Sequence, residues 1–163
     1  MTNSVKSITD EMIDVLKMYD QNDEYVFCGA FDNSYKPCPL LKPTAVLGVK
    51  EICLGEGGFG EYLGTDANGN TVMGKRCDVT LSLKLFMPRS MGQDVGSFFE
   101  VIASVLSGGP LSSGILSLSI GETSSDKLLD CFMANGEIKL RAIFNTVSSK
   151  NRFASSFSIR QDN

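Results

Sequence analysis

Hydrophobic side chains recur along this chain at two different spacings, which predict helices and strands. In residues 4–19 and 94–106 the apolar positions lie three and four residues apart, as is typical of amphipathic helices. In residues 76–87 every second side chain is apolar, as is typical of a long strand with one buried face. The apolar positions of that strand are Cys77, Val79, Leu81, Leu83, Leu85 and Met87. This pattern predicts a sheet that is covered on one side only.

Four more runs are rich in β-branched, aromatic or alternating apolar side chains. A polar turn is expected after the run at residues 116–121. The runs lie at residues 25–31, 44–53, 116–121 and 127–133. The last is followed by Ala134-Asn135-Gly136 and then by a further strand-like run at residues 137–147. Because Asn-Gly is a strong turn signal, residues 127–133 and 137–147 are predicted to form a hairpin around it.

A glycine-rich segment lies between two of the predicted strands. Residues 55–69 contain six glycines and end in Asp66-Ala67-Asn68-Gly69, which is another turn signal. The segment predicts a long β-hairpin arm over about residues 55–71.

The order of these elements predicts one α+β domain over residues 1–147. We expect a mainly antiparallel β-sheet with two α-helices packed on one face, plus the hairpin arm. Residues 148–163 are serine-rich and basic but keep several apolar side chains, so they are predicted to form a C-terminal strand or arm. A length of 163 residues suits a single domain of this kind.

Composition excludes several classes of site. The chain has five cysteines, an odd number without a CxxC pair, and no histidine, so neither a disulfide framework nor a metal site is predicted. Cys53, Cys77 and Cys131 fall in strand-like runs and are expected to be buried. The net charge of −4 argues against sequence-specific binding of nucleic acid. No apolar run is long enough for a membrane span, so no membrane partner is expected.

One motif suggests nucleotide chemistry. Gly55 to Gly60 fits the GxGxxG loop that covers phosphates in protein kinases, and Lys75 resembles the strand lysine of those enzymes. The chain lacks the histidine-containing catalytic loop and the DFG motif that phosphoryl transfer requires. We therefore expect no enzyme and no cofactor, and a nucleotide-binding module remains the less favoured alternative.

The stretch from Arg76 to Leu106 has a more specific pattern. A long alternating strand ends at Phe86-Met87-Pro88, a polar loop follows, and an amphipathic helix comes next. This order resembles the tail terminator (minor tail protein U-like) family of long-tailed phages, whose members also open with a helix and close with strands. The resemblance covers about nine tenths of the chain in the order of its elements, rather than in any diagnostic residue.

The resemblance implies a structural subunit that forms a ring, usually a hexamer. Such a ring caps the tail tube, contacts the sheath if the particle is contractile, and joins the tail to the neck, collar or head. It implies a place in a virion or phage tail-like particle that is assembled in the bacterial host cytoplasm. Another neck or tail structural protein is the alternative. The expected intersubunit contacts are Gly55, Gly57, Phe59, Tyr62 and Asn68 in the arm, and Phe153, Phe157 and Arg160 in the C-terminal segment.

Overall fold

The computed structural model describes residues 5–30, 40–56, 61–65, 69, 71–149 and 152–159, with backbone alone for residues 5–7, 72, 145–149 and 152–159. Two α-helices, two short 3-10 helices and seven strands make up this part of the chain. In chain order they are α1 (Val5–Tyr19), β1 (Val26–Gly29), β2 (Thr44–Leu54), β3 (Glu61–Thr65), β4 (Thr71–Pro88), η1 (Arg89–Met91), α2 (Val95–Gly108), η2 (Ser112–Gly114), β5 (Ile115–Asp126), β6 (Cys131–Ser149) and β7 (Arg152–Ile159).

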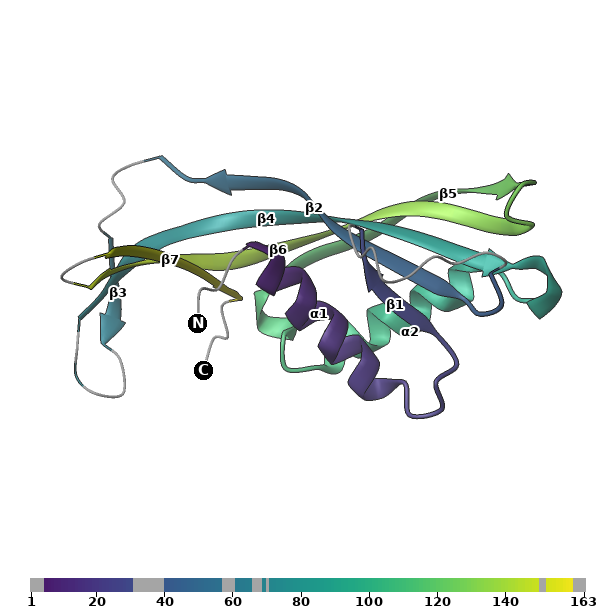
Figure 1. The fold of residues 1–163 in the computed structure, drawn as a ribbon, viewed down its shortest axis with the longest axis horizontal. Helices are drawn as coiled ribbons and strands as arrows, with labels where there is room; N and C mark the ends of the chain where they lie inside the picture. The colour runs from purple at the N-terminus through teal and green to yellow at the C-terminus, as the bar shows by residue number, and fades with distance from the viewer. Residues whose placement is uncertain are drawn as a thin grey trace.

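All seven strands belong to one sheet, built around a long ribbon of β4 and β6 (Figure 1). Strands β2 and β3 both pair with the edge of β4 that faces away from β6, each along a different part of it. Strands β5 and β7 likewise pair with different parts of the edge of β6 that faces away from β4. Strand β1 joins β2 in parallel, and the other pairings of the described strands are antiparallel. The mainly antiparallel sheet that the sequence predicts is therefore confirmed.

The core lies between the sheet and the two helices, which cover the same face (Figure 1). The alternating side chains of β4 from Cys77 to Met87 are buried on this face, as are Ile138 and Leu140 of β6. Helix α1 contributes Ile8, Met12 and Leu16, which are fully buried. Helix α1 also contacts α2, β1, β2 and β7. The α+β class with two helices on one face is confirmed.

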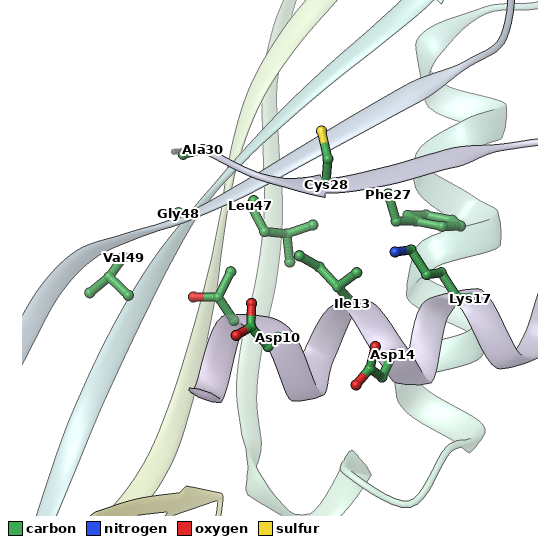
Figure 2. A pocket seen from close by; sticks show the side chains of 12 residues that line it. Asp10, Ile13, Asp14, Lys17, Phe27, Cys28, Ala30, Leu47, Gly48 and Val49 are labelled. Carbon is green, nitrogen blue, oxygen red and sulfur yellow. The ribbon is translucent and has the colours of Figure 1, made fainter. Parts of the chain in front are cut away.

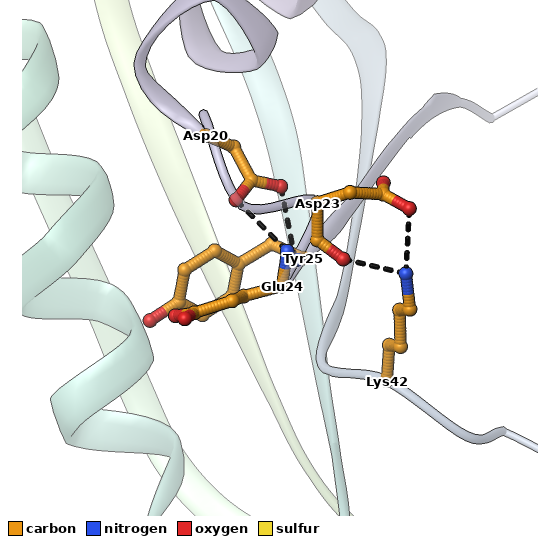
Figure 3. A network of polar contacts seen from close by, with 5 residues as sticks. All are labelled: Asp20, Asp23, Glu24, Tyr25 and Lys42. Carbon is orange, nitrogen blue, oxygen red and sulfur yellow. Dashed lines mark hydrogen bonds and ion pairs between the residues drawn. The ribbon is translucent and has the colours of Figure 1, made fainter.

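A compact polar turn connects α1 to the edge of the sheet (Figure 3). The Asp20 carboxylate accepts hydrogen bonds from the backbone N–H groups of Glu24 and Tyr25, at 2.9 and 3.0 Å. Lys42 Nζ lies 2.7 Å from Asp23 Oδ2, so the segment before β2 is held to the turn before β1. The Tyr25 ring stacks on Phe98 of α2, with 5.0 Å between ring centroids. These contacts position β1 beneath α1.

The predicted hairpin turn after residue 133 is wrong. Ala134, Asn135 and Gly136 do not form a turn, because they lie inside β6 and pair with Leu85, Lys84 and Leu83 of β4. The turn lies instead at residues 127–130, where Asp130 has a positive φ of 47°. The polar segment expected as a turn after residue 121 belongs to β5, which runs to Asp126 with a register shift between Ile120 and Thr123.

Gly136 is required in the strand for close packing. A Cβ atom at this position would lie 2.4 Å from the backbone oxygen of Ser119 on β5. Asn-Gly therefore marks a close approach of two backbones here, which a sequence pattern cannot distinguish from a turn.

Cysteine placement agrees with the sequence prediction in two of three cases. Cys77 and Cys131 are buried. Cys53 is exposed, because its position in β2 opposite Asp78 places it on the face of the sheet away from the helices.

Helix α2 begins at an N-cap that makes stability depend on pH. The Asp94 carboxylate accepts hydrogen bonds from the Ser97 backbone N–H at 2.7 Å and from the Ser97 hydroxyl at 3.1 Å, and both lower the pKa of Asp94. A lowered folded-state pKa means that the stabilisation is present above the unfolded-state pKa and is lost as pH falls through the folded-state value.

We expect Asp94→Ala to lower the melting temperature at neutral pH, with the difference from the wild type shrinking in acid. Asp94→Asn is the control, since its amide oxygen still caps the helix and does not titrate in this range. Thermal melts by circular dichroism across this pH range measure both effects, and an Asp94→Ala deficit that stays constant into acid would contradict the assignment.

Candidate functional site

The described part of the chain contains no group of three or more metal-ligating side chains. Three of its thiols, those of Cys53, Cys77 and Cys131, have raised pKa values. Burial raises the pKa of Cys77 to about 11, and burial also raises the pKa of Cys131. The pKa of Cys53 is raised by its hydrogen bond to the Glu51 carboxylate. Because the thiolate is the reactive form, none of these three groups has the environment of a cysteine nucleophile.

The glycine-rich segment interrupts an otherwise continuous strand. Leu54 at the end of β2 pairs with Cys77, and Glu61 at the start of β3 pairs with Gly74, three residues away on the same edge of β4. Lys75, the candidate phosphate-binding lysine, has only 2% of its surface exposed and lies opposite Phe144 of β6. A phosphate in solvent would not reach its ammonium group without rearrangement of the sheet.

Strands β3 and β4 form the hairpin that the sequence predicts. Thr65 pairs with Thr71, and Gly69 in the connection has a φ of 81°, which favours glycine. Gly55 lies between β2 and this hairpin, and Tyr62 lies in β3. Gly57, Phe59 and Asn68 fall outside the described residues.

The C-terminal segment contains the strand expected from the sequence. Strand β7 pairs with β6 from Ala142↔Ile159 to Ser149↔Arg152. The backbones of Phe153 and Phe157 belong to it, opposite Ser148 and Phe144, but their side chains and the whole of Arg160 fall outside the described part. Their predicted contacts with a neighbouring subunit stay predictions.

The hairpin presents large apolar side chains to solvent. Tyr62 and Met73 are directly paired and are 64% and 38% exposed, and Leu54, opposite Cys77, is 41% exposed. Met73 and Cys77 are both odd-numbered positions of one strand, so these side chains share the face that the helices cover farther along the sheet. We call Leu54, Tyr62 and Met73 the arm strip. The ribbon extends past the helices at this end (Figure 1), so the two helices do not cover the strip.

The Tyr62 side chain of the arm strip contacts another side chain of its own strand. The Tyr62 hydroxyl lies 3.0 Å from the Thr65 hydroxyl of the same strand, which limits the positions open to the ring. Strand β3 pairs with β4 along one side, and no described strand pairs with its other side. A free strand edge beside exposed apolar side chains is suited to binding another polypeptide.

A groove of about 520 Å³ lies between α1 and the edge of the sheet (Figure 2). Ile13, Phe27, Leu47 and Val49 supply apolar walls, while Asp10, Asp14 and Lys17 of α1 border it. This groove is not predicted by the sequence pattern, because it depends on the parallel pairing of β1 with β2 beneath α1. The only signal in the sequence is the row of acidic side chains on the solvent side of the first helix.

Comparison with known proteins adds no assignment: a scan against family models and a search of curated proteins find no match. No helix among the described residues is long and apolar enough to cross a membrane.

Proposed function

We propose that this chain is a structural assembly subunit, a tail terminator that forms a ring on the end of a tail tube. The arm strip is the observation that carries this proposal. Three large apolar side chains are exposed on one face of the sheet, and such a surface gains stability when another molecule covers it.

Ring formation is consistent with the shape of the molecule. A ring is a heterologous assembly, in which each subunit presents one surface to the neighbour on one side and a different surface to the other. The two ends of the sheet lie far apart along the long β4–β6 ribbon, so each end presents a different surface (Figure 1). The hexamer, the contacts with tube, sheath, neck or collar, and the place in a virion or tail-like particle rest on the family resemblance in the order of elements.

We expect the purified protein to form closed oligomers of defined subunit number. Native mass spectrometry should show a single predominant mass at a multiple of the 17.6 kDa chain, and negative-stain images should show rings. Addition of the protein to assembling tail tubes should limit their length and place a ring at one end. A chain that stays monomeric at high concentration and leaves tube length unchanged would contradict the proposal.

A further inference from the structure

Two strands at the arm end of the sheet each have one edge without a partner among the described strands. Strands β3, β4, β6 and β7 lie side by side at this end (Figure 1). One row across them runs through Glu61, Gly74, Asn145 and Ser156. Of the described strands, β3 pairs with β4 alone and β7 pairs with β6 alone. The outer edges of β3 and β7 therefore present backbone N–H and C=O groups to which another strand can be added.

The directions of these strands suit a contact between two copies in the same orientation. The three pairings are antiparallel, so β3 and β6 run one way while β4 and β7 run the other way. When two copies lie side by side in the same orientation, β7 of one copy runs opposite to β3 of its neighbour. The two outer edges then meet as an antiparallel pair, which is slightly more stable per residue than a parallel pair. Because the two edges differ, the contact can repeat in the way that a ring requires.

The charges of the two edge segments are complementary. Residues 55–71 contain no lysine or arginine, and their three carboxylates are Glu56, Glu61 and Asp66. Residues 148–163 contain three cations and one carboxylate, which are Lys150, Arg152, Arg160 and Asp162. With every charged side chain counted, the first segment carries −3 and the second carries +2. Opposite charges on two surfaces favour their association and help to select the partner.

The two outermost strands of the rest of the sheet, β1 and β5, lack this complementarity. Strand β5 contains Glu122 and Asp126 but no lysine or arginine, and β1 contains no charged residue. Charge attraction therefore does not bring these two edges together. It singles out the edges of β3 and β7.

We propose that β3 of one copy of this chain pairs antiparallel with β7 of the next copy, so that one sheet continues from subunit to subunit. This inference rests on the proposed ring and names the two edges that join in it. The contact satisfies the outer backbone groups of both strands by strand addition. It also places a new strand beside Tyr62 of β3, which is 64% exposed. The charges disfavour a β3–β3 or a β7–β7 contact, because like segments would repel each other.

Hydrogen exchange of the full chain, followed by mass spectrometry, measures this pairing. About half of the amides in an edge strand point to its outer edge, and these become hydrogen-bonded only when a further strand is added. We expect exchange at some amides of residues 61–65 and of residues 152–159 to slow by roughly tenfold or more when the chain assembles. Strand β5 is the matched control, because its outer edge also lacks a described partner. Its exchange should stay the same on assembly.

Charge reversal tests whether the two segments are partners. Glu56→Lys with Glu61→Lys changes residues 55–71 from −3 to +1, and Arg152→Glu with Arg160→Glu changes residues 148–163 from +2 to −2. Each pair of substitutions gives both segments the same sign, and we expect each to raise the concentration for half-assembly by roughly tenfold or more. The chain that carries all four substitutions restores opposite signs and should recover assembly. Sedimentation velocity over a concentration series measures these shifts.

The matched controls change the net charge by the same amount outside both segments. They are Glu100→Lys with Glu122→Lys, and Lys84→Glu with Lys127→Glu, at four exposed positions. Both control chains should assemble like the wild type. Circular dichroism melts of every variant check that the fold is intact.

The possible results separate this inference from the proposed function. Rings that form without slower exchange in residues 61–65 and 152–159, or that ignore the charge reversals, would overturn the strand pairing and leave the ring in place. A chain that stays monomeric under all conditions would overturn both. Slower exchange in both strands, weaker assembly of the two reversed chains and recovery in the combined chain would together support the pairing.

Discussion

Replacement of Leu83 by aspartate is expected to abolish folding. Leu83 has no exposed surface and lies at the centre of β4, between Leu47 of β2 and Gly136 of β6. The substitution removes a packed side chain, at a cost of about 2–5 kcal/mol, and buries a carboxylate without a partner, at a further cost of several kcal/mol. The total is comparable with the whole stability of a typical domain, about 5–15 kcal/mol. We expect the variant in the insoluble fraction, or soluble without a cooperative melt.

Lys84→Asp is the matched control for that experiment. Lys84 is the next residue of the same strand, but its side chain is exposed on the face of the sheet away from the helices. An exposed substitution of this kind typically changes stability by less than about 0.5 kcal/mol. A soluble Leu83→Asp variant that melts like Lys84→Asp would contradict the burial of this face.

Gly136→Ala is expected to destabilise the protein even though it adds a single methyl group. The new Cβ would lie 2.4 Å from the backbone oxygen of Ser119, so β5 and β6 must move apart. Overpacking costs about 1–3 kcal/mol, and this position is at the upper end because backbone atoms, which cannot change rotamer, form the contact. Urea denaturation measures the shift in midpoint.

The control for the glycine experiment is Gly29→Ala in β1. No atom lies within 4 Å of the Cβ that this substitution would add, so we expect a change close to zero or a slight gain in stability. Equal effects of the two substitutions would show that β5 and β6 do not approach each other as closely as the structure describes.

The sequence predicts the elements of this fold better than their connections. Both helices and the long strand are predicted correctly. The helical spacing of apolar side chains persists for three turns or more in each helix, and the alternating spacing persists for a dozen residues in the strand. The turn expected at Ala134-Asn135-Gly136 is wrong, because the need for a small residue beside Ser119 depends on the pairing of β5 with β6, which the pattern does not contain. The real turn follows Asp126 and contains Asp130, and aspartate is a common residue at turns, but its Leu128-Leu129 pair hides it in an apolar run.

The candidate site is only partly accessible to sequence reasoning. The sequence predicts Tyr62 in the arm, because the turn signal and the strand-like residues on either side of it are close together along the chain. Leu54 and Met73 were not expected to join it, since their common face depends on the register of β2 and β3 along β4.

The contact between α1 and β7 brings the first and last elements of the chain together. During synthesis, α1 leaves the ribosome early, but its neighbours in β2, α2 and β7 follow over almost the entire length of the chain. Contacts between residues so distant in sequence slow folding, because a long loop must close before they form. Helix α1 therefore cannot reach its final environment until β7 has been made.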